Sequence, residues 1–87
     1  MQTLGDMREH FLRVVKMSGA CGVNLSAALD ERQIDAPEYA GMVTRCRGCR
    51  EAGECDKLLA TMPVLSEAPV YCENRDEFAQ LRSVQTV

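Results

Sequence analysis

The sequence predicts an all-α protein, a compact bundle of four to five short helices. Apolar residues recur at spacings of three and four along most of the 87 residues, which is the period of an amphipathic helix. Glycine, proline, asparagine and aspartate interrupt this pattern where helices of this kind begin and end. No segment alternates apolar and polar residues as a half-buried strand does. Because a chain of this length forms one domain, we expect residues 1–87 to be a single helical metal-binding domain, for the reasons given below.

The first helix is predicted to run from about Leu4 to Met17. Its apolar side chains fall on one face, at spacings of three and four residues. In chain order they are Leu4, Met7, Phe11, Val14, Val15 and the small Ser18. We expect Gly19 and Gly22 to end this helix, because glycine is common at helix C-termini.

Two more helices are predicted from their capping residues. Asn24 is a favourable N-cap residue for a short second helix that ends near Arg32. Asp35 caps a third helix, and Pro37 suits the first turn of that helix. The inward face of the third helix is predicted to carry Tyr39, Met42, Val43, Cys46 and Cys49.

Glycine and proline divide the rest of the chain. Gly53 is expected to interrupt it before a fourth helix, from about Glu54 to Thr61. The stretch from Pro63 to Tyr71 contains two prolines, which predicts an extended, non-helical return. Asn74 is the expected N-cap of a last helix, with Glu77 placed to complete an arrangement close to a capping box.

Charge and hydropathy restrict the kinds of partner. A net charge of −3 argues against a general nucleic-acid binder or a protein of anionic membranes, since both need a basic surface. No apolar run approaches the roughly 20 residues that a membrane-spanning helix needs. Residues Met1 to Glu9 lack the basic start and apolar middle of a signal peptide. We therefore expect a cytoplasmic protein with a redox or regulatory protein partner, no membrane association and no nucleic-acid binding.

Cysteine spacing is the most specific signal in the sequence. In a reducing cytoplasm, clustered cysteines indicate metal or redox chemistry more often than disulfides. Cys46, Cys49 and Cys55 form a C-x2-C-x5-C array, and two cysteines three residues apart can share one site. Gly48 and Gly53 would let the backbone turn closely around a bulky inorganic group. The array predicts a metal centre near the junction of the third and fourth helices.

The fourth ligand could be Cys72 or Cys21. The return from Pro63 to Tyr71 can span about 30 Å when extended, so Cys72 can reach the array. Cys72 precedes a predicted helix N-terminus, where the helix dipole favours a thiolate, whereas Cys21 lies near a helix C-terminus. We predict Cys72 as the ligand and keep Cys21 as the alternative, otherwise a core residue.

Ligand spacing also bears on the identity of the metal. Three close cysteines and one distant cysteine are commoner for a [4Fe–4S] cluster, whose four irons each bind one thiolate. Structural zinc sites more often combine two knuckles of paired ligands. We predict a [4Fe–4S] cluster as the cofactor, with zinc as the alternative, and the ligands Cys46, Cys49, Cys55 and Cys72.

Basic residues near the array have expected roles as well. Arg45, Arg47 and Arg50 flank the cysteines and would offset the negative charge of a thiolate-bound cluster. His10 is the only histidine. Because it is remote from the array in sequence, we expect a surface helix residue rather than a ligand.

Most of the chain resembles a family of short, uncharacterised bacterial proteins, the domain of unknown function 6455. In that family the fourth cysteine of the pattern matches Cys72, while Cys21 is outside the pattern, so the resemblance implies the same ligand set. It implies no activity. The stretches that carry it are Leu4-Gly5-Asp6, Gly22-Val23-Asn24-Leu25, Tyr39 to Cys55, and Ala68-Pro69 through Cys72-Glu73-Asn74.

A second resemblance is local. The C-x2-C-x5-C spacing is similar to that of WhiB-like proteins and of the fumarate and nitrate reduction regulators, where it binds a [4Fe–4S] cluster with a distant fourth cysteine. In WhiB-like proteins the fourth cysteine precedes the trio, which corresponds to Cys21 here. Their tryptophan-containing turn is missing from this sequence, which has no tryptophan. This resemblance implies a cluster rather than a particular role.

The function predicted from these observations is a small iron–sulfur protein with a redox or oxygen-responsive role. We do not expect an enzyme, because the sequence shows no nucleophile–base pairing, phosphate-binding loop or acid–base dyad. One alternative is a zinc-stapled protein-interaction module without redox activity. Another is a small regulator that uses the second and third helices as a helix-turn-helix, although the acidic balance disfavours DNA binding.

Overall fold

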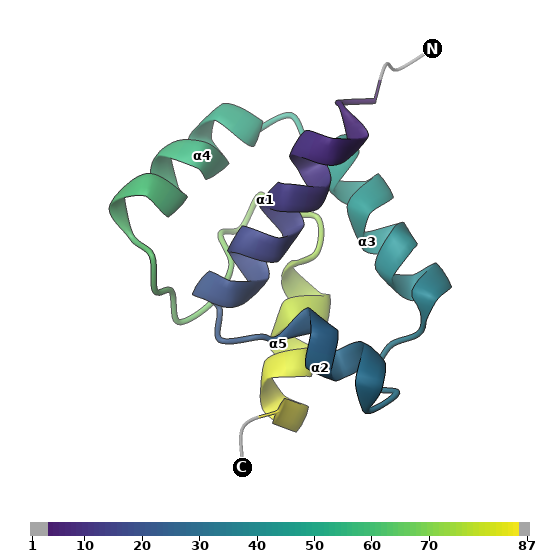
Figure 1. The fold of residues 1–87 in the computed structure, drawn as a ribbon. Helices are drawn as coiled ribbons and strands as arrows, with labels where there is room; N and C mark the ends of the chain where they lie inside the picture. The colour runs from purple at the N-terminus through teal and green to yellow at the C-terminus, as the bar shows by residue number, and fades with distance from the viewer. Residues whose placement is uncertain (1–3, 86–87) are drawn as a thin grey trace.

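Five helices make up the fold of the computed structural model, which describes residues 4–85. No strand occurs in this part of the chain, which confirms the all-α prediction. The first three and last two residues of the predicted 1–87 domain lie outside the described range. The helices are α1 (Met7–Ala20), α2 (Leu25–Asp30), α3 (Ala36–Arg47), α4 (Ala52–Thr61) and α5 (Arg75–Gln85) (Figure 1).

Side-chain caps set the starts of the first three helices. Asp6 accepts a hydrogen bond from the Glu9 backbone N–H at 2.9 Å, so α1 begins at Met7 rather than at the predicted Leu4. Asn24 caps α2, as predicted, through the backbone N–H of Ala27. Asp35 caps α3, as predicted, and forms a capping box with Glu38.

Two of the predicted glycine breaks are wrong. Gly19 lies inside α1, which continues to Ala20, and the chain turns instead at Gly22, where φ is +79°. Gly53 lies in the first turn of α4, which begins at Ala52. Gly53 does not adopt the left-handed conformation in which glycine commonly ends a helix.

The face that α1 buries differs from the predicted face. Phe11 is 42% exposed and Val15 is 41% exposed, although both were expected to point inward. The helix is instead buried along His10, Val14 and Met17. Helix α1 carries apolar side chains on most of its sides, so their spacing alone did not determine which side packs against the rest of the protein.

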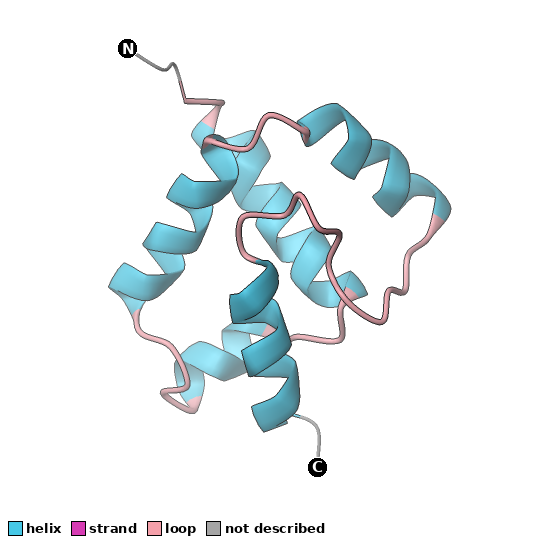
Figure 2. Cartoon of the chain, turned by 180° about the vertical axis from the view of Figure 1, so that it is seen from behind, coloured by secondary structure: helices cyan, strands magenta, loops and turns pink. Residues whose placement is uncertain are grey.

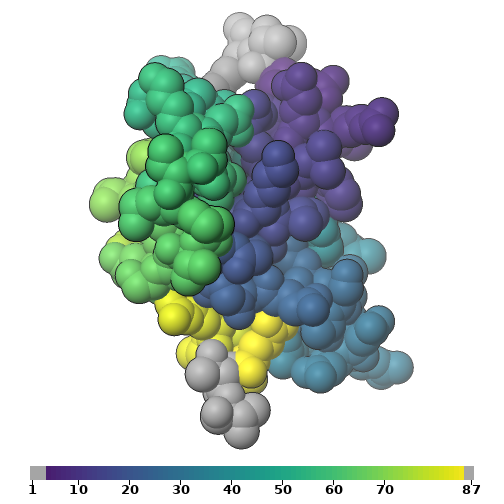
Figure 3. Space-filling model, turned by 60° about the vertical axis from the view of Figure 1, so that its left-hand side comes forward, coloured from purple at the N-terminus to yellow at the C-terminus, as the bar shows by residue number. Residues whose placement is uncertain are grey.

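Helix α1 lies at the centre of the fold and packs against both α3 and α4 (Figure 1). The space-filling view shows α4 directly alongside α1 (Figure 3). Seen from behind, the chain between α4 and α5 crosses the middle of the molecule as a loop, the predicted non-helical return (Figure 2). This arrangement places the end of α3, the start of α4 and the end of the return around one side of α1.

Asn74 connects the start of α5 to α3. Its side chain is 2% exposed, donates to the backbone carbonyl of Met42 at 2.8 Å and accepts from Arg45 Nε at 2.9 Å. The carboxylate of Glu77 pairs with Arg45 at 3.3 Å. Asn74 directly precedes α5, as predicted, and its backbone carbonyl accepts from the Phe78 N–H at 2.9 Å, while its side chain and that of Glu77 bind α3. None of the helices within residues 4–85 is long and apolar enough to cross a membrane.

Candidate metal centre

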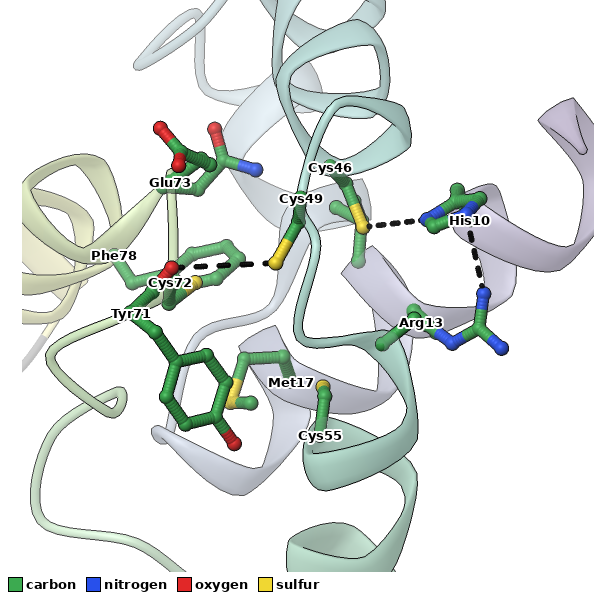
Figure 4. Close-up of a pocket in the computed structure, with 13 residues that line it drawn as sticks. His10, Arg13, Met17, Cys46, Cys49, Cys55, Tyr71, Cys72, Glu73 and Phe78 are labelled. Carbon is green, nitrogen blue, oxygen red and sulfur yellow. Dashed lines mark hydrogen bonds between the residues drawn. The ribbon is translucent and has the colours of Figure 1, made fainter. Parts of the chain in front are cut away.

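Four cysteines line one pocket beside α1 (Figure 4). Cys46 lies in the last turn of α3, Cys49 in the loop that follows, Cys55 in the first turn of α4, and Cys72 at the end of the return before α5. All four are free thiols, and each is buried or partly buried. The structure thus brings together the four predicted ligands from four different segments of the chain.

Cys21 lies apart from this pocket. It is 2% exposed, follows the last residue of α1 and lines a different hollow, beside Ser66 and Arg82. Burial raises the pKa of the Cys21 thiol. Its charge also contributes to the raised pKa of Cys72, so the two residues are neighbours without sharing the pocket. This environment is that of a core cysteine, the role that the sequence analysis gave it as the alternative to a ligand.

The thiols around the pocket disfavour one another's charge. Burial, together with the neighbouring Cys49, Cys55 and Cys72, raises the pKa of Cys46 to about 11. Burial, with a smaller effect from Cys55 and Cys49, likewise raises the pKa of Cys72 to about 11. In the metal-free protein Cys46 and Cys72 are therefore protonated at neutral pH. A cation placed among them would reverse this preference, because metal-bound thiols are deprotonated.

Backbone N–H groups point toward two of the sulfur atoms. The N–H of Glu51 lies 3.4 Å from Cys49 Sγ and donates to it. Burial raises the pKa of Cys72, while a hydrogen bond from the Asn74 backbone acts in the opposite direction. Such N–H donors favour the thiolate form, and in metal sites they tune the ligand sulfur.

His10 lines the pocket, which its place in the sequence did not predict. It is 5% exposed rather than at the surface, and its Nδ1 lies 3.3 Å from Cys46 Sγ (Figure 4). Burial lowers the pKa of His10, and the positive charge of Arg13 lowers it further. The sequence did contain a signal, because His10 lies four residues before Val14 and seven before Met17 on one helical face.

Arg13 is the cation of the pocket. Its Nε and Nη2 atoms each donate to the Asp56 carboxylate at 2.9 Å, and its Nη1 lies 3.3 Å from His10 Nε2. Its charge acts against the rise in the pKa of Cys46, which burial causes. The three expected arginines do not line the pocket. Arg47, for example, donates from Nε to the Gly5 carbonyl at 2.8 Å.

The ligand residues of the pocket match both predicted cofactors in type but not in arrangement. Four cysteine thiolates are the ligands of [4Fe–4S] clusters and of many structural zinc ions, so the residues present fit either group by type. Within residues 4–85, no group of three or more His, Cys, Asp or Glu side chains is arranged to hold a single ion. The cavity has a volume of about 30 Å³, so a four-iron cluster requires its walls to move apart.

Fold and site together define a class: a small all-α protein with four free cysteines around one partly buried pocket. Within this class, the chain belongs to a family described as Family of unknown function (DUF6455), whose model matches residues 1–84. This confirms the resemblance to the domain of unknown function 6455, while the local resemblance to WhiB-like proteins and the fumarate and nitrate reduction regulators stays a prediction. Neither curated proteins nor solved structures give a match to the chain.

Proposed function

We propose that this protein holds a [4Fe–4S] cluster through Cys46, Cys49, Cys55 and Cys72, and that it has a redox or oxygen-responsive role with a protein partner. The observation that carries the proposal is the meeting of four free thiols, from four chain segments, around one pocket. When bound, such a cluster accepts or gives up one electron. The four thiolates would hold it, and α1 would cover one side.

The electrostatics of the pocket favours the binding of a positively charged group. Burial, together with the neighbouring cysteines, raises the pKa of Cys46 and that of Cys72 and so disfavours their thiolates in the metal-free protein. Buried charges are stable only when they are paired or coordinate a metal. The positive charge of the irons would stabilise all four thiolates at once, and binding would therefore release protons and stabilise the fold.

The contact between His10 and Cys46 resembles the pair of a catalytic cysteine and its base, but the electrostatics opposes this role. A nucleophilic cysteine paired with histidine has a lowered pKa and a charged imidazole. Here burial raises the pKa of Cys46 to about 11, and burial lowers the pKa of His10. We therefore propose a cofactor-binding role rather than an enzymatic one.

Zinc is the second candidate, and the size of the cavity favours it. A volume of about 30 Å³ is closer to the space of a single small group than to that of a four-iron cluster. In this case the same cysteines would bind one ion, and the metal would contribute folding free energy to a protein-interaction module. The sulfur atoms would then have to converge, since they do not form a single-ion site as they stand.

A reductive titration tests the redox role. Protein purified without oxygen is titrated with dithionite and then reoxidised, while its visible absorption is recorded. The proposal predicts an absorption band that bleaches and returns through several cycles, and that is absent from the Cys49→Ser variant. A colourless protein that contains one zinc ion per chain would refute the redox role and support the interaction module.

A further inference from the structure

We propose that His10 is a positioning residue, which donates a hydrogen bond from Nδ1 to the sulfur of Cys46 and thereby orients this ligand and stabilises its thiolate. The inference rests on the proposed function, since it treats Cys46 as a metal ligand. Its geometric basis is the distance of 3.3 Å between His10 Nδ1 and Cys46 Sγ. His10 lies on α1 and Cys46 on α3, so the bond also joins two helices.

Arg13 determines which nitrogen of His10 carries the proton. Arginine is a donor only, and its Nη1 lies 3.3 Å from His10 Nε2. Nε2 must therefore accept, which leaves the proton of the neutral ring on Nδ1, facing Cys46. Two bonds of 2.9 Å to Asp56 hold the guanidinium in place. The series from Asp56 through Arg13 and His10 to Cys46 thus fixes the direction of each hydrogen bond.

Gly5 forms the opposite wall around the imidazole. A methyl group added at Gly5 would overlap His10 Nε2 and approach Cδ2 to 2.5 Å. The backbone of Gly5 is itself held by Arg47, whose carbonyl accepts from the Gly5 N–H at 3.0 Å. The ring therefore lies between the backbone before α1 and the side chains of Arg13 and Cys46, and it has little freedom to rotate.

This arrangement suits a ligand that carries negative charge. An N–H donor aimed at a metal-bound thiolate withdraws electron density from the sulfur, which raises the reduction potential of an iron–sulfur cluster. Partners of this kind also fix the orientation of the ligand, and their loss typically weakens metal binding about 10–100-fold. His10 would act on the metal through Cys46 rather than by binding it.

The first test reads the tautomer in the metal-free full-length chain, so it is independent of the metal. Long-range proton–nitrogen NMR of histidine labelled with ¹⁵N distinguishes the two neutral tautomers of the single histidine. The proposal predicts the Nδ1–H form in the wild type and a shift toward the Nε2–H form in Arg13→Met. An Nε2–H form in the wild type would overturn the assignment.

The second test uses the anaerobically purified, iron-loaded protein. His10→Leu fills the site without a donor, whereas His10→Asn keeps an N–H near the position of Nδ1. We expect His10→Leu to have a lower reduction potential than the wild type, and His10→Asn to recover part of the difference. An unchanged potential in His10→Leu at full iron content would overturn the proposal. A wild-type chain that binds no iron would instead refute the proposed function, and the tautomer would still test the hydrogen-bond arrangement.

Discussion

Single residues around the pocket differ in ways that separate ligand candidates from core thiols. Cys72 lines the pocket with three other cysteines, whereas Cys21 is 2% exposed and faces another hollow. Both lie next to a helix end and both have raised pKa values because of burial. Of these two cysteines, only Cys72 shares its pocket with other cysteines that could act as further metal ligands.

Replacing each of these two cysteines by alanine gives a matched comparison. Cys72→Ala should reduce metal binding to background, because it removes one of four ligands. Cys21→Ala should keep a full complement of metal and should lose only about 1 kcal/mol of stability, the cost of a small core cavity. Metal content per chain after gel filtration measures both. Normal metal in Cys72→Ala and loss in Cys21→Ala would show that the two roles are reversed.

Gly5 and Gly19 offer a second matched pair. Gly5→Ala should destabilise the protein by about 1–3 kcal/mol, because the added methyl overlaps the imidazole of His10. Gly19→Ala meets no atom within 4 Å and lies inside α1, so it should stabilise the protein by about 0.5–1 kcal/mol. Urea unfolding followed by circular dichroism gives both values. Equal effects of the two substitutions would contradict the packing of Gly5 on His10.

The contact of His10 with Cys46 could not be predicted from the sequence. Its partner Cys46 is 36 residues away, and the hydrogen bond exists only because α1 packs on α3. The spacing of His10 with Val14 and Met17 was its one local signal, but Phe11 and Val15 offered an equally apolar face, so this spacing alone did not show which face is buried. The cysteines could be predicted as a group because their spacing is itself the signal.

Secondary-structure elements were predictable where their determinants are local. Asn24 and Asp35 cap α2 and α3 as expected, since a cap binds an N–H only three residues away. Asn74 has the same sequence signature, yet its side chain is used to bind Met42 and Arg45 of α3. That role depends on how α5 approaches α3, which the sequence pattern does not encode.

Removing the Asn74 side chain tests the connection between α5 and α3. Asn74→Ala should cost about 1–3 kcal/mol, because buried hydrogen bonds are lost and Arg45 loses a partner. It should also weaken metal binding about 10–100-fold, since the Asn74 side chain holds in place the backbone that donates a hydrogen bond to Cys72. Gln80→Ala, at an exposed position of the same helix, should stay within about 0.5 kcal/mol of the wild type. Urea unfolding and metal competition measure these effects, and equal stability of the two variants would contradict the role of Asn74.

At the scale of the whole molecule, the thiols make the metal-free protein sensitive to alkaline pH. Burial raises the pKa of Cys46 and that of Cys72 from 9.0 to about 11. Between these values the unfolded chain releases protons that the folded chain retains, so stability is fully present below about pH 9 and falls as pH rises toward 11. Urea midpoints measured across this range should decrease.

The control for this prediction is the double variant Cys46→Ala, Cys72→Ala. Burial also raises the pKa values of Tyr39 and Tyr71, which adds a decrease of the same sign. The double variant keeps the tyrosines and should show a smaller decrease than the wild type. Identical pH dependence in the two proteins would contradict the raised thiol pKa values.

Analysis of metal and acid-labile sulfide, on full-length protein purified without oxygen, tests the central claim most directly. The proposed [4Fe–4S] cluster predicts a brown protein with about four irons and four sulfides per chain, and none in Cys49→Ser. One zinc per chain without sulfide would support the four-cysteine site, but would show that it holds zinc instead of a cluster. A wild-type protein that contains neither metal, even after reconstitution, would contradict the claim that these four cysteines form a metal centre.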